Sequence, residues 1–310
     1  MATLGGQVSV LNDINTRQKT KITSLGYPCN NLTDASCFVQ TLNTVTLKTT
    51  SGSMGSLNDN TWAYIDWASR SGIADTLWSV GDRKGIALNY TIDGTAINGT
   101  YYVYILGFDH NAAKEGSNLI HFETGFTALS GGVHIAFCSN WNGNSSPNTY
   151  GFTMNTTNTN SGGWASSQMR NYHLNGTSGT INLWPEEVRK VIKNVTKYTD
   201  NTGGTSTLTS TPTATTDKMF LLSYYEVHGT TNASYMNVNE ANYNAQYQYY
   251  KNGNPQVKYN HQSTGTPISW WERSPRGDAT KTFNLGADTE GYVSSNAANI
   301  HKGVSPAFCV

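Results

Sequence analysis

The chain has 310 residues, a formal net charge of zero and only 13% charged residues. This balance shows no sign of the basic patch that nucleic-acid-binding proteins and proteins of anionic membrane surfaces carry, so we expect no nucleic-acid partner. The length allows one large domain or two ordinary ones. With 30 glycines, 18 tyrosines and 8 tryptophans, the composition indicates a folded, loop-rich protein that favours β-structure.

The N-terminus begins MATLGG and carries no basic region, and no apolar run is long enough for a secretory signal or a transmembrane helix. We therefore expect neither membrane insertion nor classical secretion. Residues 1–50 are rich in Thr and Asn, and residues 39–47 alternate as a half-exposed strand does. This N-terminal part is either an extra hairpin or an arm that docks the protein onto a larger assembly.

The next elements are predicted by local signals. The run Asn58-Asp59-Asn60 predicts the start of a helix that continues to Arg70 and ends at Gly72. Residues 85–90 and 100–108 read as strands, joined through an Asp93-Gly94 turn and a second turn at Asn98-Gly99. Residues 119–122 form a plausible further strand, and residues 139–163 a long surface loop.

The middle of the chain carries the clearest helical pattern, over residues 185–195. Pro185 suits a first helical position, acidic residues follow it, and apolar residues recur at helical spacing. Residues 199–216 read as a loop or spur, and residues 218–227 as a strand with a buried centre. Residues 232–266 form a dense field of Asn, Tyr and Gln.

The C-terminal part contains short strand patterns at residues 283–285 and 290–293. The final apolar residues, 304–310, predict that this end of the chain is tied into a sheet, because a free end would expose them to water. Of the adjacent Trp270 and Trp271, one indole is expected in the core, and the other in the core or on a contact surface. Arg273 follows them and is predicted to be a structural hydrogen-bonding or stacking partner.

No catalytic or metal-binding motif stands out. The cysteines have no CxxC spacing, and Cys138 and Cys309 each end an Ala-Phe-Cys run, which predicts two buried strand cysteines. His110 and His121 each lie near a carboxylate, but one sequence cannot show three or four ligands converging. Structural roles are the better interpretation for both, and we predict no metal, no cofactor and no catalytic residue.

Two C-terminal motifs carry a family resemblance: Trp-Trp-x-Arg-Ser-Pro at residues 270–275 and Gly-Val-x-Pro-x-Phe-Cys at residues 303–309. Together they resemble an uncharacterised domain family of gut bacteria and their phages. That family is similar to the C-type-lectin-like fold of formylglycine-generating enzymes and of the variable proteins of diversity-generating retroelements. Further matching segments are residues 57–62, 78–84, 162–170, 218–223 and 226–227.

The resemblance implies an α+β fold: a C-type-lectin-like domain over residues 57–310, with antiparallel sheets, a few short helices and long loops. Residues 1–56 would form the N-terminal arm. Retroelement-diversified proteins of this fold vary in their C-terminal hairpins, which implies a ligand-binding surface here. The residues implied for this surface are Trp271, Glu272, Arg276, Asp278, Lys281, Asp288, Tyr292, Asn296, Asn299 and His301. Taken singly, each of them is better interpreted as an ordinary solvated turn residue.

The first functional hypothesis is a phage virion surface protein: a capsid decoration, head fibre or tail-associated binder made in the host cytoplasm. It would bind a host-cell or mucosal glycan or protein, and its arm would contact other virion proteins. A bacterial surface adhesin of the same fold is the alternative. An enzyme related to formylglycine-generating oxidases is weaker, because those enzymes use two neighbouring cysteines and Cys309 stands alone. Homo-oligomerisation stays open, since no heptad pattern is present.

Overall fold

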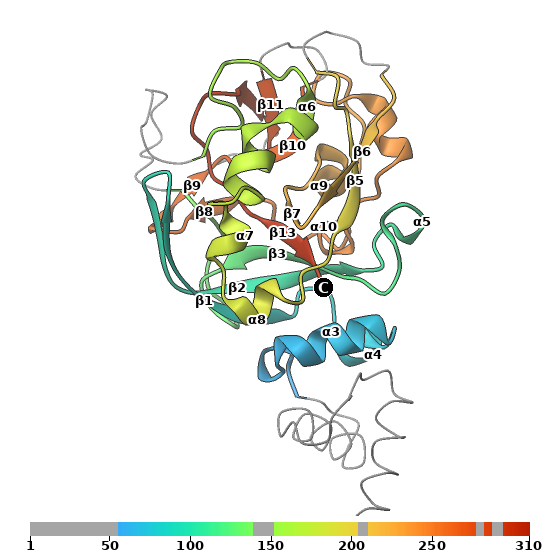
Figure 1. Ribbon diagram of the computed structural model, residues 1–310, viewed down its shortest axis with the longest axis vertical. Helices are drawn as coiled ribbons and strands as arrows, with labels where there is room; N and C mark the ends of the chain where they lie inside the picture. The colour runs from blue at the N-terminus through green and yellow to red at the C-terminus, as the bar shows by residue number, and fades with distance from the viewer. Residues whose placement is uncertain (1–54, 139–151, 204–209, 277–281, 287–293) are drawn as a thin grey trace, which may run out of the picture. The chain divides into compact units, whose positions relative to one another are not determined.

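The computed structural model describes residues 55–138, 152–203, 210–276, 282–286 and 294–310. Ser56–Val310 form one compact unit, an α+β arrangement of several antiparallel sheets and a few short helices (Figure 1). The predicted α+β class is therefore confirmed. Residues 1–54, the predicted strand at 290–293 and most of the predicted 139–163 loop lie outside the described residues.

The largest sheet has five strands in the order β1-β2-β3-β13-β7. Strands β1 (Arg83–Ile92) and β2 (Thr95–Phe108) form a long hairpin. Its turn is Asp93-Gly94, where φ is +47° and +73°, as the tight turn favoured in hairpins requires. The predicted hairpin is confirmed, but the predicted second turn at Asn98-Gly99 is wrong. Those residues lie within β2 and pair with β1, because the ladder satisfies their backbone groups.

The C-terminal strand β13 (Ala307–Cys309) pairs with β3 (Ile120–Phe126) on one side and β7 (Met219–Phe220) on the other. Both predictions, of a strand near residues 119–122 and of a sheet-bound end, are confirmed. Phe308 is fully buried, and its ring stacks on Phe122 with centroids 5.4 Å apart. The last residues thus lie inside the sheet and complete the core.

Helix α3 (Trp62–Arg70) packs its apolar face on this core. It begins later than predicted, because the Thr61 side chain accepts a hydrogen bond from the Tyr64 N–H, 3.2 Å away, and so caps it. The residues expected to cap it instead belong to the 3₁₀ turn η1 (Leu57–Asp59) and its end. The other short helices before α8 are α4 (Ala74–Leu77), α5 (Ala112–Glu115), α6 (Gly163–Ser166), η2 (Met169–Leu174) and α7 (Thr180–Leu183).

The predicted helix over residues 185–195 is wrong in extent. Only α8 (Glu186–Arg189) is helical, and β5 (Val195–Thr199) begins where the helix was expected to end. The Lys193 N–H donates to the Cys309 carbonyl, 2.9 Å away, so this backbone joins the C-terminal strand instead. Part of the predicted spur is also a strand, β6 (Thr213–Asp217), which pairs with β5. The β-branched residues here suit a strand as well as a helix face.

The predicted strand over residues 218–227 is only partly correct. It contains β7, but Ser223 then starts helix α9 (Tyr224–His228). The Ser223 hydroxyl accepts a hydrogen bond from the Glu226 N–H, and the Glu226 carboxylate accepts one from the Ser223 N–H. This reciprocal capping box is the signal that the sequence analysis missed.

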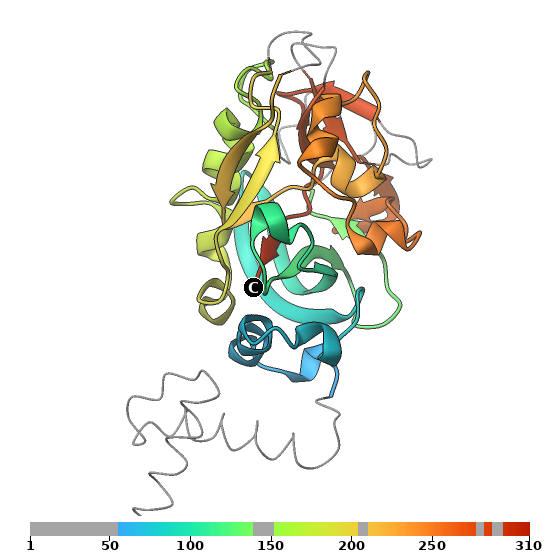
Figure 2. The same ribbon diagram turned by 90° about the vertical axis from the view of Figure 1, so that its right-hand side faces the viewer.

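Smaller sheets complete the fold. Figure 2 shows α6–α8 with β5 and β6 on one side, most of the orange and red C-terminal elements on the other, and the red strand β13 between them. No helix of the described residues is long and apolar enough to cross a membrane.

The predicted strand at residues 283–285 is confirmed within β10-β11-β12. The remaining bounds are β4 (Ile135–Ala136), η3 (Val238–Asn242), α10 (Gln248–Lys251), β8 (Lys258–Asn260), β9 (Ser263–Ile268), β10 (Trp271–Pro275), β11 (Thr282–Leu285) and β12 (Ser294–Ala297).

Candidate functional site

Strand β3 brings polar side chains into the core. Successive side chains of a strand point to opposite faces, so His121 and Glu123 share one face while Phe122 points to the other. Both polar residues have no exposed surface. The segments around α10 and β8 supply partners for both. Two buried polar clusters result, one around Lys197 and one around Glu123.

The Lys197 cluster comprises Lys197, Glu115, Glu226, Tyr247 and Arg273. Alternation along β5 turns Lys197 inward. Its Nζ lies 2.8 Å from Glu115 Oε2, 3.2 Å from Glu226 Oε1 and 2.8 Å from the Tyr247 hydroxyl. The Arg273 guanidinium donates to the second oxygen of Glu226. Two carboxylates and two cations therefore lie together in the core.

The two acids of this cluster behave differently. Burial raises the pKa of Glu115, and its single cationic partner Lys197 does not offset that effect. Burial acts on Glu226 as well, but Arg273 and Lys197 outweigh it and hold the pKa of Glu226 below its usual value. Glu226 therefore stays ionised between its two cations. The cluster is a hydrogen-bonded ion network of the kind that is costly to break at one member.

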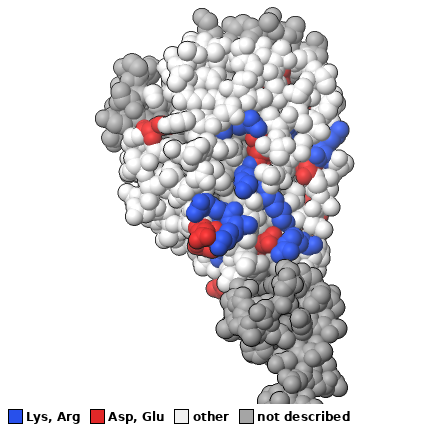
Figure 3. Space-filling model, viewed as in Figure 1, with Lys and Arg blue, Asp and Glu red and all other residues white. Residues whose placement is uncertain are grey.

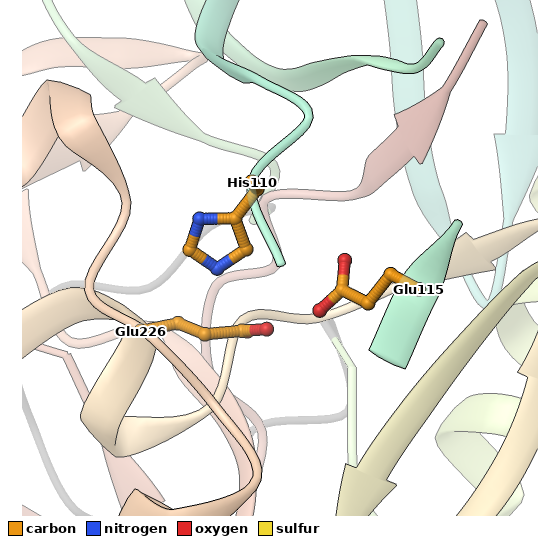
Figure 4. Close-up of side chains that lie close together, drawn as sticks. All are labelled: His110, Glu115 and Glu226. Atoms are coloured by element: carbon orange, nitrogen blue, oxygen red, sulfur yellow. The ribbon is translucent and has the colours of Figure 1, made fainter. Parts of the chain in front are cut away.

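Three ligand atoms in this region could hold a metal ion. They belong to His110, Glu115 and Glu226 and lie within 4.8 Å of one another. Figure 4 shows a ring nitrogen of His110 directed toward both carboxylates. His110 Nε2 is buried without a hydrogen-bond partner, and burial together with Lys197 lowers the pKa of this imidazole to about 3. The Lys197 ammonium, however, already binds both carboxylates and supplies the charge that a metal would bring, so we assign no metal here.

Cys309 and His121 form a buried pair beside this cluster. The Cys309 sulfur lies 3.2 Å from His121 Nδ1, and the Tyr247 hydroxyl lies 3.1 Å from the same nitrogen. Burial raises the pKa of the Cys309 thiol, so the thiol stays protonated at neutral pH. Cys138 and Cys309 are both buried, as predicted, but only Cys309 lies in a strand, because β4 ends at Ala136 before Cys138. A thiol in this state is a structural residue, not an activated nucleophile.

The second cluster surrounds Glu123. Its carboxylate accepts hydrogen bonds from Tyr104, from Tyr250 at 2.8 Å and from Lys258 at 2.5 Å. Lys258 Nζ also lies 4.0 Å from the centroid of the Trp270 ring. Burial lowers the pKa of Lys258 to about 8, although Glu123 opposes that effect. All five side chains are buried, so this cluster fixes β3 to the C-terminal segments and offers no access to a ligand.

The predicted ligand-binding residues fall into three groups. Trp271 and Glu272 on β10 have no exposed surface: the Trp271 indole N–H donates to the Phe152 carbonyl at 2.8 Å, and Glu272 lies 2.8 Å from His228. These two residues therefore cannot belong to an exposed surface, and both indoles of the tryptophan pair are core. Asp278, Lys281, Asp288 and Tyr292 lie outside the described residues.

The remaining four predicted residues reach the surface at or near the β10-β11-β12 sheet. Arg276 and Asn296 are partly exposed, Asn299 is exposed, and His301 is partly exposed. Arg276 donates to the Ser295 hydroxyl at 2.7 Å, so the sheet brings it next to β12. We call this group the C-terminal surface; it consists of Arg276, Asn296, Asn299 and His301.

A second candidate site is a pocket that sequence reasoning did not assign. Its volume is about 360 Å³. One side comes from the Asn/Tyr/Gln field noted in the sequence, but Lys114 and the 211–212 segment come from distant parts of the chain, and no local pattern links them. The lining residues are Lys114, Thr211, Pro212, Asn239, Asn242 and Tyr243.

The face of the molecule in Figure 3 carries few charged side chains. Figure 3 shows that most of this face is neither acidic nor basic, and that its Lys and Arg side chains are mixed with Asp and Glu. Such a surface binds through hydrogen bonds and shape more than through a strong field. The fold and its two candidate surfaces thus define an α+β domain with a closed ionic core and polar exposed loops.

The chain belongs to the family described as domain of unknown function DUF6273, whose model matches residues 148–310, just over half of the chain. The match includes the Trp-Trp-x-Arg-Ser-Pro motif, β13 and all lining residues of the pocket except Lys114. Neither the curated proteins nor the solved structures compared with the chain match it.

Proposed function

We propose that the protein is a binding protein displayed on a phage virion, where it recognises a host-cell or mucosal glycan or protein. The C-terminal surface carries this proposal. It lies on and beside the β10-β11-β12 sheet, in which the edge strand β10 is entirely buried, while the opposite edge strand β12 is partly exposed along its length. A rigid base beneath exposed polar side chains is the arrangement that preorganised binding surfaces use.

The base needs no metal to be rigid. Arg273 on β10 joins the Lys197 cluster, and Ser274 next to it donates to the buried Glu240 carboxylate at 2.6 Å. These bonds fix the strand that supports the C-terminal surface. We therefore expect ligand binding to be independent of divalent cations.

The resemblance to a phage and gut-bacterial family supports the placement on a virion, and the C-type-lectin-like fold belongs to the same proposal. Residues 1–56 would form the arm that contacts other virion proteins. The weakly charged, Asn- and Tyr-rich composition suits recognition outside the cell. A bacterial surface adhesin would use the same surface and differ in where the protein is displayed.

Two measurements test the proposal. Mass spectrometry of purified virions should find the protein as a particle component. On an array of glycans, mucins and host-cell surface fractions, we expect binding that survives EDTA and falls at least tenfold in an Asn299→Ala, His301→Ala double variant. Asn89→Ala, at an exposed position on β1, is the matched control and should bind as the parent protein does. Virions that lack the protein, or a folded protein that binds nothing on the array, would contradict the proposal.

A further inference from the structure

The pocket beside α5 has walls that the fold holds in place. Asn237, which is fully buried, donates to the Ser210 carbonyl at 2.8 Å and to Asp200 Oδ2 at 3.1 Å. This ties the start of η3 to the segment that leads into Thr211. On the opposite side, the Asn111 amide donates to the Tyr243 carbonyl at 2.6 Å and ties η3 to α5. The pocket is therefore formed before any ligand arrives.

Lys114 gives this pocket a positive charge. Its side chain is exposed, and its Nζ lies 4.9 Å from the centroid of the Tyr243 ring and 5.7 Å from that of Tyr198. The neighbouring acid, Glu115, points inward and is bound to Lys197. Among the residues that the structure describes, no carboxylate pairs with Lys114. The two tyrosine rings thus hold an ammonium group that no carboxylate of the described residues neutralises.

The other lining groups are neutral and suit a polyhydroxylated ligand. Asn239 and Asn242 present amides that both donate and accept hydrogen bonds, and Thr211 adds a hydroxyl. Tyr243 lines the pocket and is partly exposed, with its ring packed against Tyr198 at a centroid distance of 5.2 Å. Its exposed part can contact the C–H groups of a sugar ring. We propose that this pocket binds a saccharide carrying a carboxylate, with Lys114 pairing the acid and the amides pairing the hydroxyls. The inference goes beyond the proposed function, because the pocket is a different site from the C-terminal surface, and it rests on that function only for its biological setting.

The test is direct titration of the full chain by calorimetry at low salt. Two acidic probes distinguish which sugar supplies the carboxylate: a galacturonate oligomer and a sialylated lactose. Galactose oligomers of equal length and plain lactose are their neutral counterparts. We expect at least one acidic probe to bind at least tenfold more tightly than its neutral counterpart, and its affinity to fall as salt is added. Equal affinity for acidic and neutral probes, or no binding of any probe, would overturn the proposal.

Matched variants then place the site. Lys114→Gln keeps most of the side-chain volume and removes the charge, so binding of the acidic probe should weaken at least tenfold. Lys251→Gln removes an exposed lysine of α10 that does not line the pocket, and it should leave the affinity unchanged. Equal losses in both variants would indicate a general charge effect and overturn the assignment to this pocket.

The outcome of this experiment can be distinguished from the outcome of the test of the proposed function. A protein found on virions that binds array ligands through the C-terminal surface, but no acidic probe in the pocket, would overturn only the pocket. A protein that binds the acidic probe through Lys114 but is missing from virions would leave the pocket assigned and remove the virion setting.

Discussion

Arg273 connects more of the structure than any single motif in the sequence suggests. Its guanidinium donates to the Leu221 carbonyl at 2.9 Å, to the Thr199 hydroxyl at 2.9 Å and to the Asn244 side chain at 3.1 Å, besides its ion pair with Glu226. The prediction that Arg273 is a structural partner is confirmed. The sequence could not identify these partners, because they come from three separate segments, around residues 199, 221–226 and 244, that only the folded chain brings together.

Replacing Arg273 tests how much this network contributes to the free energy of unfolding. Arg273→Met retains apolar volume but leaves Glu226 buried beside one cation instead of two, so we expect a loss of about 3–5 kcal/mol in the free energy of unfolding, measured with urea. Lys190→Met breaks an exposed ion pair with Glu186 on α8 and should leave the urea midpoint nearly unchanged. Similar midpoints for the two variants would show that the buried network contributes little.

The buried Glu240 carboxyl predicts that the free energy of unfolding depends on pH. Burial raises the pKa of this carboxyl to about 7 from an ordinary value of 4.5, while the Asp200 N–H, the Ser274 hydroxyl and Arg273 oppose the shift and the Asp200 carboxylate adds to it. Between these two pH values the folded state holds a proton that the unfolded state has lost. The stability that Glu240 contributes therefore falls as pH rises from about 4.5 to about 7, by on the order of 3 kcal/mol, and is constant above that.

Glu240→Gln removes this titration. Urea unfolding of both proteins at several pH values between 4.5 and 8.5 gives the difference in their unfolding free energies. We expect the advantage of the parent protein over the variant to shrink across pH 5–7 and to level off above pH 8. Parallel stability curves across the whole range would mean that Glu240 does not titrate in this window.

At the scale of elements, strong local signals were reliable and mixed ones were not. The Asp93-Gly94 hairpin and the apolar C-terminal strand were predicted because turn chemistry and alternation agreed. The 185–195 helix was too long, because β-branched residues such as Val191 and Ile192 suit a strand as well, and contact with β13 decided the outcome. Helix α9 was missed because its capping box lies inside an apolar run.

Strand β13 offers the clearest element-level prediction. Phe308 packs against Phe122, Trp184 and Trp62, with ring centroids 5.3–6.1 Å apart. Phe308→Ala leaves a cavity among these rings and should cost about 3–5 kcal/mol of unfolding free energy. Tyr172→Ala, at a side chain that is 49% exposed, should shift the melting temperature far less. Comparable shifts in calorimetry would contradict the central position of β13.

At the scale of the whole molecule, the sequence predicted the α+β class and four members of an exposed C-terminal surface. It did not predict that Trp271 and Glu272 are buried, because a tryptophan pair is equally consistent with a core and with a contact surface. The pocket at Lys114 could not be predicted for a different reason: Lys114 lies 97 or more residues before the other lining residues. Sites assembled from distant segments leave no local pattern.

The strand order also constrains how the chain is made. A ribosome releases β1, β2, β3 and β7 long before β13, yet β13 lies between β3 and β7. Until residues 307–309 emerge, both neighbours have unpaired backbone edges and the rings around Phe308 are exposed, a state prone to aggregation and attractive to chaperones. Nascent chains that stop short of β13 therefore cannot complete the sheet, and the core around Phe308 closes only after residues 307–309 have been made.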